Sequence, residues 1–274
     1  MNKRLLAAFV VLTAAGALSG QNRQQPAPAA PRLPGGRVSL GATTNEKGHW
    51  IRQGRAQLAT NSESVIAAGP GGLSTNLQLA DVPFQPWARA LFDYRQKNFE
   101  RDAPHSRCKP SPGPRQVGTA YGFEIVEMRE LERVFIFDIG GPHSFRVIYM
   151  DSRPHPDPPD PTYIGHSTGR WVGDTLVIDT VGFNEGSWIE AEGLPHTDQL
   201  HLVERFTRTD FNTLKYEVTV EDPGAYTRPW IGGFNLRWNA NAEMFEYVCQ
   251  DNNLVEETND GADGAIRRPS SITP

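Results

Sequence analysis

The sequence lacks clustered basic residues, long apolar runs and cofactor motifs, and each absence excludes a class of protein. Its net charge is −5 with scattered lysines and arginines, which excludes the positive surface that binds nucleic acid. It has no P-loop, no dinucleotide-binding fingerprint and no C-x-x-C pair. We therefore predict no cofactor, and as the partner we expect a small molecule and no nucleic acid.

The first residues have the pattern of a secretory signal peptide. A basic start at Asn2 to Arg4 precedes an apolar stretch from Leu5 to Leu18, and small residues surround the expected cleavage site. The apolar stretch is shorter than the about 20 residues that a membrane-spanning helix needs. No cysteine follows it to carry a lipid anchor. The sequence therefore predicts an exported protein, periplasmic or secreted, and not a transmembrane protein.

The only two cysteines, Cys108 and Cys249, form an even pair in a chain predicted to be exported. Such a pair favours a disulfide bond, with two buried free thiols as the alternative. The disulfide would connect the segment before the first long strand to the last predicted strand.

Runs of β-branched and aromatic residues separated by short turns predict an all-β protein. The clearest case is the Gly173-Asp174 turn, which joins a run from Tyr163 to Trp171 to a run from Thr175 to Phe183. Further strands are expected at 123–128, 133–139, 145–150, 200–208, 214–221, 230–238 and 243–249. We predict an antiparallel meander of about nine strands that forms a lipocalin-like barrel or a strongly curled sheet, because closure removes exposed edges.

The predicted organisation has five parts. They are a signal peptide (1–19), a flexible tether rich in Pro, Gln and Ala (20–40), an extended segment packed on the barrel (41–118), the barrel (119–255) and a flexible tail (256–274). The extended segment contains a short helix at about 84–100, on which Trp87, Leu91 and Tyr94 share one stripe. It also contains a candidate short strand near residues 48–51.

Histidines and carboxylates near the strand ends are the candidate catalytic residues, because such groups exchange protons near neutral pH. The candidates are His155, His196, Asp198, His201 and Glu204. We expect no metal site, because His201 and Glu204 face opposite ways in a strand. A metal site made from His196, Asp198 and a loop histidine such as His155 stays the alternative.

Two carboxylates occupy unusual positions in the predicted strands. Glu204 lies among apolar residues, so it is either a site residue or the ion-pair partner of Arg146 or Arg237. Asp179 lies in mid-strand, which is rare for Asp and indicates a cross-strand partner. The candidate partners of Asp179 are Arg170, Arg205 and Lys215.

Aromatic residues are numerous on the predicted strands, and they are the candidate walls of a binding site. The candidate ligand-binding residues are Trp171, Phe183, Trp188, Tyr216, Trp230, Trp238 and His166.

Several motifs together resemble a large uncharacterised family of exported bacterial proteins. They are RCKP (107–110) with GPR (113–115), IYMDSRPHP (148–156), GHSTGRWVGDTLVIDTVGFN (165–184) and LHLVERF (200–206). The resemblance covers about residues 80–255; it implies export and supplies no catalytic residues. A fainter architectural similarity is to lipocalin-like and calycin-like barrels, in which a Gly-x-Trp such as Gly169-Arg170-Trp171 packs at one end.

The sequence leaves three functions open. The first is the binding of a small apolar or aromatic molecule in the barrel. The second is an acid–base enzyme, a lyase, isomerase or hydrolase of a small molecule, with the His, Asp and Glu candidates at the barrel mouth. The third is a structural envelope module without a pocket.

Overall fold

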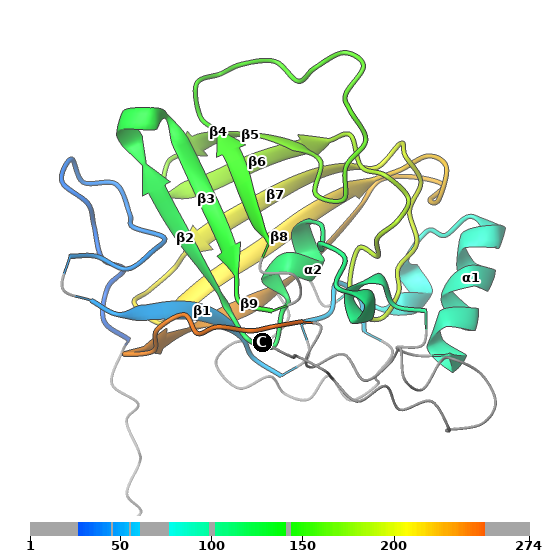
Figure 1. Ribbon diagram of the computed structural model, residues 1–274, viewed down its shortest axis with the longest axis horizontal. Coiled ribbons are helices and arrows are strands. Elements are labelled where there is room, and N and C mark those ends of the chain that lie inside the picture. Colours follow the sequence, from blue (N-terminus) through cyan, green and yellow to red (C-terminus); the bar gives the residue numbers. More distant parts are fainter. Residues whose placement is uncertain are drawn as a thin grey trace, which may run out of the picture.

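Nine strands form one closed barrel in chain order (Figure 1). The computed structural model describes residues 27–44, 46–54, 56–60, 77–98, 102–140 and 144–249, so the predicted signal peptide and C-terminal tail lie outside the described residues. The strands are β1 (Gly48–Arg52), β2 (Phe123–Met128), β3 (Arg133–Asp138), β4 (Phe145–Tyr149), β5 (His166–Val172), β6 (Thr175–Val181), β7 (His201–Arg208), β8 (Thr213–Glu221) and β9 (Trp230–Ala240). The prediction of an all-β barrel is confirmed.

One neighbouring pair, β4 and β5, is parallel, although the sequence predicts a purely antiparallel meander. Ile148 lies opposite Ser167, and Tyr149 lies opposite Thr168. The connection between these strands, residues 150–165, is rich in proline, which cannot donate ladder hydrogen bonds. A parallel pair needs a connection of about a dozen residues or more, because the chain must return to the same end of the barrel before the second strand begins. Residues 150–165 are long enough to do so.

The barrel closes between its last strand and its first. β9 pairs with β1, from Ala240 opposite Gly48 to Leu236 opposite Arg52. The predicted strand at residues 243–249 is wrong, since residues 241–249 contain no strand, and the candidate strand near residues 48–51 takes its place. Pairing β9 with β1 removes two open edges that a terminal hairpin would leave exposed.

Alternation along the strands divides side chains between the barrel interior and the outer surface. In β8, Leu214, Tyr216, Val218 and Val220 are buried, as predicted, while the residues between them are half-buried on the outside. The even-numbered residues of β7 are buried in the same way. The core therefore lies inside the barrel.

Segments outside the wall cover both ends of the barrel (Figure 1). At one end, residues 28–44 lie across the strand turns, where Arg32 pairs with Asp174 and the Phe211 N–H donates to the Pro28 carbonyl. The opposite end carries the helices that precede β2. They are η1 (Leu79–Asp81), α1 (Pro86–Lys97), η2 (Pro104–Arg107) and α2 (Gly113–Val117), while η3 (Arg129–Leu131) joins β2 to β3.

The predicted helix is α1, but it buries a different face from the one expected. Ala88 and Phe92 are buried, whereas Trp87 and Tyr94 are 45% and 49% exposed. Phe92 packs on Phe84, with ring centroids 5.5 Å apart. Because the helix carries aromatic residues all around it, its spacing alone does not determine which face meets the barrel.

A disulfide joins Cys108 to Cys249, as predicted. It connects the segment between η2 and α2 to the chain beyond β9, across a sequence separation of 141 residues. No helix within the described ranges combines the length and the apolar character needed to span a bilayer.

Candidate functional site

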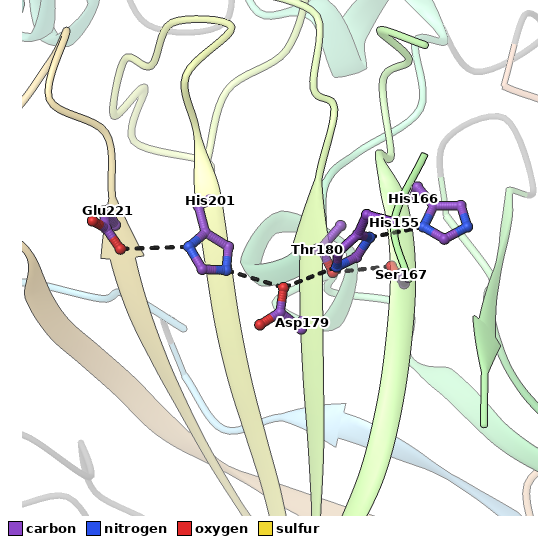
Figure 2. A network of polar contacts seen from close by, with 7 residues as sticks. All are labelled: His155, His166, Ser167, Asp179, Thr180, His201 and Glu221. Carbon is purple, nitrogen blue, oxygen red and sulfur yellow. Dashed lines mark hydrogen bonds and ion pairs between the residues drawn. The ribbon is translucent and has the colours of Figure 1, made fainter. Parts of the chain in front are cut away.

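Three histidines from separate motifs lie together on the outer face of the barrel (Figure 2). His166 on β5, Asp179 on β6, His201 on β7 and Glu221 on β8 occupy adjacent strands near one end of the wall. Their strand neighbours Ser167, Thr180 and Leu202 are buried in the interior, so alternation directs the site residues outward. His155 joins them from the proline-rich loop between β4 and β5. We call Glu221, His201, Asp179, His155 and His166 the histidine row.

Asp179 is the centre of the histidine row. One of its carboxylate oxygens, Oδ1, lies 3.0 Å from His155 Nε2 and 3.0 Å from His201 Nε2. On one side, His201 Nδ1 lies 3.4 Å from Glu221 Oε2. On the other side, the Nδ1 atoms of His155 and His166 are 2.8 Å apart. The five side chains therefore form one continuous chain of polar contacts.

The carboxylates favour the charged form of His201. Its hydrogen bond to Asp179 raises the pKa of His201, and Glu221 adds to the effect. In return, the hydrogen bond from His201, followed by that from His155, lowers the pKa of Asp179. This part of the row is therefore an imidazole placed between two carboxylates that favour its protonated form.

The contact between the two Nδ1 atoms requires one ring to donate and the other to accept. In the tautomer in which His155 donates its Nε2–H to Asp179 and accepts at Nδ1, His166 donates its Nδ1–H and its Nε2 carries a lone pair. No described residue forms a hydrogen bond or ion pair with that Nε2. Burial lowers the pKa of His166, and His155 and Arg153 lower it further, which favours the neutral form of the ring.

The sequence analysis predicts several members of the histidine row but does not predict that they lie together. His155, His166 and His201 were candidates, but Asp179 was expected to pair with Arg170, Arg205 or Lys215, and Glu221 was not a candidate. The observed partners of Asp179 are histidines, because β7 places His201 diagonally across from it and the loop folds His155 over it. In the sequence, the mid-strand position of Asp179 is the feature that indicates a site at this place in the sheet.

Residues 165–169 also spell G-x-S-x-G, the pattern of a serine nucleophile at a strand-to-helix turn. Here Ser167 lies within β5, is 1% exposed, and points into the barrel, where its hydroxyl contacts that of Thr180 at 2.9 Å (Figure 2). His166, its neighbour, faces outward. The geometry of a nucleophile elbow is therefore absent from this stretch of β5.

Glu204 lies on the opposite side of the wall from the histidine row. Arg146 donates to it from β4 through Nη1 at 2.6 Å and Nη2 at 3.2 Å, and the Tyr216 hydroxyl donates to it at 3.0 Å. The arginine and glutamate side chains are 1% and 0% exposed. Since β4 and β7 are not neighbours, this ion pair crosses the barrel interior. The expected alternative, a pair with Arg146, is the one observed.

His196 and Asp198 do not join the row. His196 is buried in the loop before β7, where its Nε2 lies 3.1 Å from the Ser187 hydroxyl and burial lowers its pKa. Asp198 is exposed two residues further on. Within the described ranges, no three or more His, Cys, Asp or Glu side chains are arranged to hold a metal ion.

The candidate ligand-binding aromatic residues divide into two groups. Phe183, Trp188, Tyr216 and Trp230 are buried in the packed core. Trp171 and Trp238 line a pocket of about 210 Å³ beneath residues 33–42, at the end of the barrel covered by the N-terminal segment.

Comparisons with known protein families, with curated proteins and with solved structures gave no match to this chain. The resemblance to exported bacterial proteins therefore stays a prediction.

Replacing Glu204 should destabilise the fold strongly. Glu204→Gln leaves the Arg146 charge buried without a counter-ion, which we expect to lower the free energy of unfolding by roughly 3–5 kcal/mol. Urea unfolding followed by circular dichroism measures the change. Glu217→Gln, which removes a half-exposed partner of Lys215, is the control and should cost about 1 kcal/mol or less. Equal effects of the two substitutions would contradict a dry interior ion pair.

Replacing Asp179 should have an effect that depends on pH in a defined window. A lowered pKa of Asp179 contributes stability above about pH 4, and a raised pKa of His201 contributes stability below about pH 6.5 that is lost as pH rises through the raised value. The stability difference between wild type and Asp179→Asn should therefore be largest between about pH 4 and 6.5 and shrink at higher pH.

Urea unfolding at a series of pH values measures this difference. Asp174→Asn is the matched control, because its partner Arg32 does not titrate and its effect should stay constant above about pH 4. If the stability difference between wild type and Asp179→Asn stayed constant between pH 5 and 9, the contact with Asp179 would not raise the pKa of His201.

Proposed function

We propose that this protein is an acid–base enzyme that acts on a small molecule at the outer rim of the barrel. The observation that carries the proposal is the chain of contacts from Asp179 through His155 to His166 Nδ1, which leaves His166 Nε2 at the end of the histidine row. A base whose ring is fixed by a second group, which is in turn fixed by a carboxylate, is the arrangement by which proteins activate protons.

The row supports both the removal and the storage of a proton. When His166 accepts a proton at Nε2, its Nδ1–H stays donated to His155, whose Nε2–H stays donated to Asp179. The Asp179 carboxylate therefore stabilises the new positive charge through His155. A positioned base of this kind contributes about 10²–10⁴-fold to a rate.

The location of the row determines how a substrate reaches it. The side chains of His155, Asp179 and His201 are 24%, 30% and 32% exposed, so the site opens to solvent on the outside of the wall. Proton transfer of the kind that His166 can perform is a step in many lyase, isomerase and hydrolase reactions.

We also propose that the enzyme works outside the cytoplasm, as the predicted signal peptide indicates. The Cys108–Cys249 disulfide supports this location, because disulfides persist in oxidising compartments such as the periplasm.

Hydrolysis of p-nitrophenyl acetate tests the base without knowledge of the natural substrate. A water gives a proton to His166 Nε2 and attacks the acyl carbon, p-nitrophenolate leaves, and the proton returns to solvent. We expect His166→Gln to lower the protein-dependent rate at least tenfold at pH 7.5. The wild-type rate should fall as the pH drops through the lowered pKa of His166, which lies below the ordinary histidine value of about 6.5, because the ring becomes protonated there.

His105→Gln is the matched control for this assay. His105 lies in η2, outside the row, and burial with the nearby Arg115 lowers its pKa to about 3, so it is neutral throughout the assay. Equal rates for wild type and His166→Gln, or equal losses in both variants, would overturn the proposal.

A second function, the binding of a small apolar or aromatic molecule, is favoured by the pocket beneath residues 33–42. Its volume of about 210 Å³ exceeds that of cavities of about 150 Å³ that bind benzene. Leu40, Ile125, Val134 and Leu176 give it apolar walls beside Trp171 and Trp238. This pocket suits one aromatic ring.

Filling the pocket tests this second function. Toluene should raise the melting temperature of wild type in a saturable way, because it binds only the folded state. Val134→Phe, which adds a ring at the pocket wall, should remove that increase. Val172→Phe, at an exposed position outside the pocket, should retain it. An increase that persists in Val134→Phe would place toluene elsewhere.

A further inference from the structure

The polar surface around His166 continues onto two more strands. The ring of Tyr149 on β4 stacks on the His166 imidazole, with centroids 5.3 Å apart. Arg133 on β3 lies opposite Tyr149 in the strand register, and its guanidinium carbon is 5.5 Å from the centre of the Tyr149 ring. Arg153, from the loop that carries His155, lies 4.0 Å from the same ring centre. Two guanidinium groups thus share one aromatic ring with the proposed base.

The two arginines differ in how their charge is balanced. Arg153 is held by both carboxylate oxygens of Asp151, with Nε to oxygen distances of 2.9 and 3.0 Å. Arg133 makes no side-chain hydrogen bond or ion pair with any described residue, although its Nε is buried. A contact with an aromatic ring does not neutralise a charge. The positive charge of Arg133 is therefore not paired with a carboxylate of any described residue.

We infer that the substrate of the proposed enzyme carries an oxyanion, a carboxylate or a phosphate, that binds Arg133 beside Tyr149 and places the reacting group at His166 Nε2. This inference rests on the proposed function and adds the chemical class of the substrate. Guanidinium groups present a planar set of N–H donors that matches the oxygens of both anions.

The charges along the outer wall give the bound substrate one orientation. Positive charge lies at the β3–β4 side, whereas the carboxylates of Asp179 and Glu221 lie beyond His155 on β6 and β8. An anion is attracted to the Arg133 side and repelled from the far side. His166 lies between the two, so the uncharged part of the substrate falls over its Nε2. A cationic substrate has no comparable partner at Arg133.

A pair of esters that differ in charge tests the inference. Mono-p-nitrophenyl glutarate carries a carboxylate, and p-nitrophenyl butyrate is neutral. We expect kcat/KM of wild type to be at least tenfold higher for the anionic ester at constant ionic strength. Arg133→Met should remove this preference, so that the two esters react with similar kcat/KM, while Arg133→Lys should retain part of it.

Controls separate this inference from the proposed function. Arg205→Met, which removes an arginine from the outer face of β7, should keep the preference for the anionic ester. If His166→Gln lowers the rate with the neutral ester but wild type shows no preference, the oxyanion site is wrong and the base stands. If His166→Gln changes neither rate, the proposed base is wrong.

A binding measurement gives a readout besides activity and distinguishes the two anions. The imidazole NMR signals of His166 should shift with inorganic phosphate or with acetate in wild type and not in Arg133→Met. A larger response to phosphate would assign the natural substrate to the phosphates, and a larger response to acetate to the carboxylates. No response to either anion would overturn the inference.

Discussion

Closure of the wall by β1 on β9 is the constraint on which the rest of the structure depends. Once every strand has two neighbours, alternation sends each side chain either into the barrel or onto its outer surface. His201 and Glu204 lie on one strand only three residues apart, yet the wall separates them completely. His201 belongs to the histidine row on the outer surface, and Glu204 belongs to the ion pair in the interior.

The two sides of the wall satisfy their charges by different means. Inside, Glu204 has lost its water and depends on Arg146 and the Tyr216 hydroxyl, so those three groups hold opposite parts of the barrel together. Outside, Asp179 keeps contact with solvent, and its two partners are histidines, the residue type that most often exchanges protons in proteins. The interior pair is therefore suited to stability, and the histidine row is suited to proton transfer.

A rigid wall and a long loop together produce the geometry of the histidine row. β5 to β8 place four of its members at adjacent register positions, which fixes their separations to those of the sheet. The fifth member, His155, comes from the proline-rich connection that also makes β4 and β5 parallel. That connection carries Arg153 as well, so one segment supplies both the histidine that contacts His166 and a cation beside Tyr149.

The sequence by itself determined the architecture, because hairpin turns and two-residue alternation are local patterns that most strands of this barrel follow. It also favoured the disulfide, since two cysteines allow one pairing, and it named Arg146 and Arg237 as the candidate ion-pair partners of Glu204. Only the tertiary structure decided which strand closes the barrel, which face of α1 is buried, and that Asp179 joins His155 to His201. Those outcomes depend on contacts between residues far apart in the chain. Local spacing carries no information about which distant residues come into contact.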